Sequence, residues 1–169
     1  RRQRQMCIRD RVMADANSLI STNASAEPVY AWFENGVIKW WSEAKDVNAG
    51  KSLSYLCYKM RNLTDISGLN EWQTGNVTYM SCMFYGCSKL TDLTPLTNWQ
   101  TGKVTDMSYM FANCAKLTNT VGINSWDISK VTTFAGMFGN CPSHPEFTKR
   151  SGTWYSAVSY THLRAHETL

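Results

Sequence analysis

The stretch NWQTGKVTDMSYMFANCAKL, residues 98–117, decides the fold because the chain contains it three times. EWQTGNVTYMSCMFYGCSKL at 71–90 and SWDISKVTTFAGMFGNCPSH at 125–144 align with it without a gap. Tryptophan, valine, methionine, phenylalanine and cysteine therefore recur at a constant step of 27 residues. A period in the twenties predicts stacked repeats, because one such unit cannot bury its apolar side alone.

The first half of each unit has the apolar spacing of a helix. In the middle copy, apolar residues recur at steps of three and four, which is typical of one helical face. They are Val104, Met107, Met110, Phe111, Cys114 and Leu117. Thr105 before Asp106 fits a helix N-cap, and Asn113 fits the left-handed residue that ends a helix. We therefore expect a short helix of about two turns in each unit.

The second half, KLTDLTPLTNW at 89–99, has a different pattern. Leu90, Leu93 and Leu96 are separated by polar and turn residues, which favours a short strand followed by a turn. Leu63 and Leu117 occupy the slot of Leu90 in the neighbouring units. Stacked at the usual strand spacing, these positions would form a continuous apolar ladder.

Both flanks of the repeats resemble caps. Asn35-Gly36 lies between two aromatic and β-branched runs, a strong hairpin signal within an N-terminal cap at 28–44. Pro142 and Pro145 end the repeat pattern, and FTKRSGTWY offers one closing strand in a C-terminal cap at 142–155. The sequence therefore predicts an α/β fold, a leucine-rich-repeat-like right-handed solenoid with short helices and a cap at each end. The expected organisation is N-terminal cap 12–51, repeats 52–141, and C-terminal cap 142–157, between the two terminal segments 1–11 and 158–169.

The basic charge of the chain is confined to one end. The chain has 17 Lys and Arg against 13 Asp and Glu, and residues 1–11 supply the whole excess of +4. Both terminal segments, 1–11 and 158–169, can be back-translated into the two arms of a transposase-based sequencing adapter. We therefore expect both to be adapter-derived, and the basic arm not to be a nucleic-acid site. No apolar run is long enough to cross a bilayer, so we expect no membrane insertion by this part of the protein.

Catalytic and metal-binding patterns are weak. His144 is the only imidazole between the terminal segments, and no glycine-rich phosphate loop occurs. The interval from Cys82 to Cys87 is too wide for a zinc pair. We therefore expect no enzyme activity, no cofactor and no metal site. The cysteines at 87, 114 and 141 fit buried free thiols, although stacked coils would also bring them near disulfide distance.

The units resemble the BspA-like repeat of bacterial surface proteins, a divergent leucine-rich repeat written W-[DQN]-T-[SG]-x-V-T-x-M-S-x-M-F-x-x-C-x-x-L. The matching residues of the middle copy are Trp99, Thr101, Gly102, Val104, Thr105, Met107, Ser108, Met110, Phe111, Cys114 and Leu117. The resemblance covers residues 52–141, with departures at Cys57 and Phe134. It implies an extracellular, secreted or wall-attached protein that acts in adhesion and protein recognition.

One outward polar row is the candidate binding surface. It consists of Thr64, Asp65, Thr91, Asp92, Thr118 and Asn119. Short polar groups on a rigid array suit a protein or glycan partner, and solvated surface is the alternative. The aromatic residues of the hairpin could stack on sugars or cover the first repeat. At the level of function, the alternative to a recognition module is a rigid spacer that presents another domain.

Overall fold

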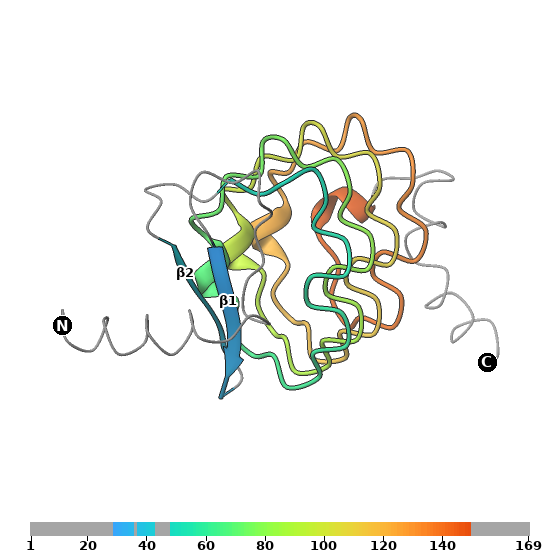
Figure 1. The fold of residues 1–169 in the computed structure, drawn as a ribbon. Helices are drawn as coiled ribbons and strands as arrows, with labels where there is room; N and C mark the ends of the chain where they lie inside the picture. The colour runs from blue at the N-terminus through green and yellow to red at the C-terminus, as the bar shows by residue number, and fades with distance from the viewer. Residues whose placement is uncertain (1–28, 36, 43–47, 150–169) are drawn as a thin grey trace, which may run out of the picture.

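The computed structural model describes residues 29–35, 37–42 and 48–149. Strands β1 (Val29–Glu34) and β2 (Val37–Ser42) pair antiparallel, with Glu34 opposite Val37 (Figure 1). This hairpin contacts the repeats at two points. Val37 forms a parallel bridge with Asp65, and the Trp40 indole donates a hydrogen bond to the Gly68 carbonyl. The hairpin thus lies against the first repeat.

From residue 51 the chain winds through coils that lie side by side (Figure 1). We number them coil 1 (51–77), coil 2 (78–104), coil 3 (105–131) and coil 4 (132–149). Thr78, Thr105 and Thr132 begin coils 2 to 4, and each donates its amide to the residue 27 positions earlier. The regular elements in the coils are the 3-10 helices η2 (Ser67–Leu69), η3 (Thr94–Leu96), η4 (Val121–Ile123) and η5 (Glu146–Lys149).

Backbone hydrogen bonds between coils follow a strict alternation. Every second amide from residue 80 to 86 donates to a carbonyl 26 positions later in coil 3, as from Phe84 to Met110 at 2.8 Å. The same four bonds join coil 1 to coil 2 and coil 3 to coil 4. Intervening amides close turns within their own coil, as from Cys87 to Phe84 at 3.1 Å. Backbone polar groups are therefore satisfied partly by local turns within a coil and partly by the neighbouring coil.

Two left-handed residues in each coil explain this pattern. The first lies at Tyr55, Cys82, Tyr109 and Gly136, with φ between 54° and 64°. The second lies at Lys59, Gly86, Asn113 and Asn140, with φ between 58° and 73°. A left-handed residue interrupts a right-handed helix. The two left-handed residues of each coil lie four positions apart and bend the chain into successive turns. Alternate amides of this segment then face the next coil.

The predicted α/β leucine-rich-repeat-like solenoid is therefore wrong. Among the described residues there is no α-helix, and the segment around Leu90, Leu93 and Leu96 is no strand but leads into η3. Thr105 is not a helix N-cap, because its hydroxyl donates to the Thr78 carbonyl at 3.2 Å. At the C-terminal end, residues 147–149 of the expected closing strand belong to η5, and its residues 150–155 lie outside the described residues.

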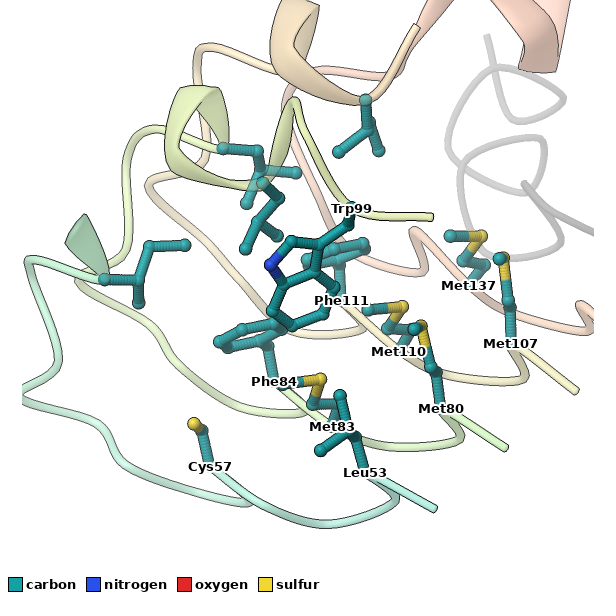
Figure 2. Packing of buried hydrophobic residues seen from close by; sticks show 14 of the residues in the cluster. Leu53, Cys57, Met80, Met83, Phe84, Trp99, Met107, Met110, Phe111 and Met137 are labelled. Carbon is teal, nitrogen blue, oxygen red and sulfur yellow. The ribbon is translucent and has the colours of Figure 1, made fainter. Parts of the chain in front are cut away.

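The core is built from columns of identical residues. The rings of Phe84, Phe111 and Phe138 stack on one another with centroids 5.5 and 5.3 Å apart. Methionines line one side of this column (Figure 2). Leu63, Leu90 and Leu117 are fully buried, as is expected of one slot repeated in adjacent coils. Each such side chain contributes about 1.5–3 kcal/mol of burial free energy.

Two further columns join the coils through their side chains. The Trp99 and Trp126 indoles donate to the carbonyls of Leu69 and Leu96, at 2.9 and 3.0 Å. The thiols of the cysteine column donate to carbonyls 30 positions earlier, as from Cys114 to Phe84 at 3.2 Å. The described cysteines are free and all but Cys82 are buried. In this arrangement the repeated cysteines act as small apolar residues that also satisfy a buried carbonyl.

Candidate recognition surfaces

The predicted polar row lies on one side of the stack. Thr64, Thr91 and Thr118 are exposed and occupy the same slot in coils 1 to 3. The Thr118 amide donates to the Thr91 carbonyl at 3.1 Å, which fixes the register of these two coils. We call Thr64, Thr91 and Thr118 the threonine row. The structure thus brings these three predicted residues together.

The acidic and amide residues of the predicted site serve the backbone. Asp65 accepts the Ser67 amide at 2.7 Å, Asp92 accepts the Thr94 amide at 2.8 Å, and Asn119 accepts the Val121 amide at 3.1 Å. Each bond lies at the start of a 3-10 helix, where a side-chain acceptor replaces a missing backbone partner. Asp65, Asp92 and Asn119 are half-buried. They have a structural role, and the Thr118 hydroxyl likewise donates to the Thr91 carbonyl at 3.4 Å.

A second surface was not predicted from the sequence. Four tyrosines expose 40 to 59 % of their surface: Tyr55, Tyr58, Tyr79 and Tyr109. A fifth, Tyr85, is half-buried. We call these five residues the tyrosine face. The sequence signal was the slot at 55, 82, 109 and 136, which holds Tyr, Cys, Tyr and Gly. Such variation between invariant buried positions indicates an outward side chain.

Ring contacts join the tyrosines of different coils. Tyr58 stacks on Tyr85 with centroids 5.2 Å apart, and Tyr55 meets Tyr58 edge-on at 5.4 Å. The Lys59 ammonium lies 5.0 Å from the centroid of the Tyr58 ring. At Gly136, a β-carbon would lie 2.6 Å from the Tyr109 ring, so the ring rests directly over the glycine backbone.

Charge is divided between the two arcs of each coil. The first arc comprises 51–62, 78–89 and 105–116, with five basic residues and one acid, Asp106. The second arc comprises 63–77, 90–104 and 117–131, with two basic residues and four acids. The basic residues of the first arc are Lys51, Lys59, Arg61, Lys89 and Lys116, and all of them are exposed. The tyrosine face is therefore basic and the threonine row lies on the acidic arc.

Titratable groups reflect these surroundings. The Cys82 thiol beside Tyr55 is the main cause that raises the pKa of the Tyr55 hydroxyl. Burial raises the pKa of the Cys87 thiol to about 12. Hydrogen bonds from Ser129 lower the pKa of Asp127. His144 is half-buried, with its ring 5.6 Å from that of Phe138.

The described residues contain neither a metal-binding group nor a membrane-spanning helix. Within 29–35, 37–42 and 48–149, no three His, Cys, Asp or Glu side chains gather as a metal-binding group. No helix in this described part of the chain is long and apolar enough to cross a membrane.

The hairpin aromatic Trp40 is half-buried and packs against the core cluster, so its ring helps to cover the first coil.

Comparison with known families gives one match. The model of the family described as "Mycoplasma protein of unknown function, DUF285" matches residues 51–163. The chain belongs to this family. Its match begins where coil 1 begins, so the repeats are the part that defines membership. No curated protein and no solved structure matches the chain. The adapter origin expected for residues 1–11 and 158–169 concerns segments outside the described residues and stays a prediction.

Proposed function

We propose that this DUF285 chain is a non-catalytic recognition and adhesion module that acts at the bacterial surface and binds a protein or glycan. The observation that carries the proposal is the presentation of exposed side chains on one hydrogen-bonded stack. The threonine row repeats one slot in coils 1 to 3, whereas the tyrosine face combines three slots, two of which hold tyrosine in two coils each. The resemblance to BspA-like surface repeats supports an extracellular setting.

Rigidity favours this function for a physical reason. Binding costs less free energy when the contacting side chains need no ordering of their backbone. Here every second backbone amide in the first arc is bonded to the next coil, as from Cys82 to Ser108 at 2.9 Å. Tyrosine adds a large contact area with only two rotatable side-chain angles. A stack of this kind can therefore recognise a partner without rearrangement.

A rigid spacer is the second candidate function. It is favoured by the bonds of Asp65, Asp92 and Asn119, since these side chains stabilise the coils rather than point to a ligand. A spacer would use its repeats only to separate other domains. The exposed aromatic rings argue for recognition instead, because exposed large apolar groups that gather on one face commonly mark interaction sites.

The test is a solid-phase binding screen of the full chain against extracellular matrix proteins and glycans. Saturable binding to a member of the panel, competed by soluble chain, is the expected result. Heat-unfolded chain at the same concentration is the control for adhesion through exposed core residues. Absence of saturable binding across the panel would contradict the proposal and favour the spacer.

A further inference from the structure

We infer that the tyrosine face is the binding surface, and that its partner is an acidic segment of another protein. The inference rests on the proposed function, to which it adds the face and the partner's chemistry. Its central residues are Tyr55, Tyr58 and Tyr85, which contact one another across coils 1 and 2. Tyr79 and Tyr109 extend the face along coils 2 and 3.

Charge complementarity identifies the partner as acidic. Lys59 and Arg61 follow Tyr58 in coil 1, and Lys89 follows Tyr85 in coil 2. All three are exposed. Asp106 is the single acid of this arc, and it is occupied by the Ser108 amide and hydroxyl at 2.8 and 2.7 Å. A partner that carries Asp or Glu would meet an excess of positive charge, which speeds association and favours specificity.

The ring arrangement favours a carboxylate partner as well. Tyr85 and the Lys59 ammonium both lie over the Tyr58 ring. Tyr55 also meets this ring in an edge contact, so three groups surround the ring and its hydroxyl is left for a ligand. The hydroxyl can donate a hydrogen bond, which suits a carboxylate. A sugar that stacks on an aromatic residue needs an open ring face instead.

The composition of the face favours a protein over a glycan. Tyrosine and arginine are the residues that most often dominate protein–protein interfaces. Arg61 is exposed in the same arc as the three contacting rings, and its guanidinium can bind a carboxylate with two parallel hydrogen bonds. The threonine row has neither exposed rings nor an excess of basic charge, and it serves as an internal control.

The experiment measures binding of the full chain to a synthetic peptide of alternating Glu-Phe and Asp-Gly units by isothermal titration calorimetry. The matched probe replaces every Glu and Asp with Gln and Asn, and heparin represents an anionic glycan. We expect saturable binding of the acidic peptide that weakens as salt rises, and no binding of the neutral peptide. Equal affinity for both peptides would overturn the inference. Saturable binding of heparin without binding of the acidic peptide would also overturn it, in favour of an anionic glycan.

Variants then locate the site. Tyr58→Ala with Tyr85→Ala should weaken binding of the acidic peptide at least about tenfold, and Lys59→Gln with Lys89→Gln should weaken it and reduce its salt dependence. Thr91→Ala, on the other arc, should bind like the unchanged chain. Thermal unfolding midpoints show whether each variant is folded. If the double tyrosine variant does not fold, the double lysine variant still tests the site.

The two proposals can fail separately. If saturable binding in the matrix screen is unchanged by the tyrosine and lysine substitutions, the tyrosine face is not the binding site, but the proposed recognition function is retained. If only Thr91→Ala abolishes that binding, the binding site lies at the threonine row. No saturable binding to the screen or to the acidic peptide would overturn both proposals.

Discussion

The two arcs of each coil keep the same register by different means. In the first arc, register comes mainly from backbone bonds to the next coil, so outward slots can hold Tyr55, Cys82, Tyr109 or Gly136 without loss of the stack. In the second arc, side chains such as Asp92 supply much of the local order themselves. The comparison shows that a polar residue at the surface can have a structural role, as Asp92 does.

The largest test of this division compares the core with the surface. Phe111 stacks on Phe84 and Phe138, so Phe111→Ala should lower the free energy of unfolding by about 3–5 kcal/mol. Thr91→Ala, on the exposed row, should change it by no more than about 0.5 kcal/mol. Urea titrations of both variants check this. Similar losses from the two substitutions would show that the buried and exposed columns are assigned incorrectly.

A glycine at the contact between second arcs gives the next largest effect. A β-carbon on Gly122 would lie 2.4 Å from the Leu93 carbonyl oxygen, and backbone cannot move aside cheaply. Gly122→Ala should therefore destabilise the fold by about 1–3 kcal/mol, as overpacking does. Gly50→Ala is the matched control, because nothing lies within 4 Å of its β-carbon position. A Gly122→Ala protein as stable as Gly50→Ala would contradict the close approach of coils 2 and 3.

The tryptophan column separates a hydrogen bond from apolar burial. The Trp99 indole donates to Leu69, whereas the buried Trp72 indole nitrogen has no acceptor among the described residues. Trp99→Phe should therefore cost more than Trp72→Phe, by about 1 kcal/mol for the lost hydrogen bond, to which the weakened stacking on Trp126 adds. Chemical denaturation of the two variants measures the difference. Equal costs would mean that the indole bond contributes nothing to stability.

The smallest effect at neutral pH concerns the cysteine column. Burial raises the pKa of the Cys87 thiol from its ordinary value of 9.0 to about 12 in the folded chain. The stability that is linked to this thiol is therefore fully present below the pKa of Cys87 in the unfolded chain. It is lost as pH rises toward the pKa of Cys87 in the folded chain, because the unfolded chain releases the proton first. Cys87→Ala should flatten this decline between pH of about 9 and 12. An unchanged slope of unfolding free energy against pH would contradict the burial of this thiol.

Part of this architecture could be predicted from the sequence. The 27-residue step indicated which residues share a column, because apolar residues that recur without gaps need the same buried slot. The helix prediction failed at Tyr109, whose left-handed backbone has no signal in a tyrosine side chain. Apolar steps of three and four fit successive turns as well as a helix. The strand prediction failed at Leu93, since a step of three leads into a 3-10 helix whereas a strand alternates in steps of two.

The candidate site was predicted in part for a similar reason. Exposure of Thr91 follows from its place between buried leucines, but the bond from the Thr94 amide to the Asp92 carboxylate depends on a turn that the sequence did not reveal. The tyrosine face could not be predicted without the contact between Tyr58 and Tyr85, which lie 27 residues apart in the sequence. Only the stacked coils bring these rings together.

The most direct test of the account is a measurement of scalar couplings across hydrogen bonds by NMR on the isotopically labelled full chain. The coil stack predicts that the Phe84 amide nitrogen couples to the Met110 carbonyl carbon, and the Phe111 amide nitrogen to that of Met137. Couplings from Phe84 to Met80 and from Phe111 to Met107, four residues back, would instead show α-helices and contradict the stack.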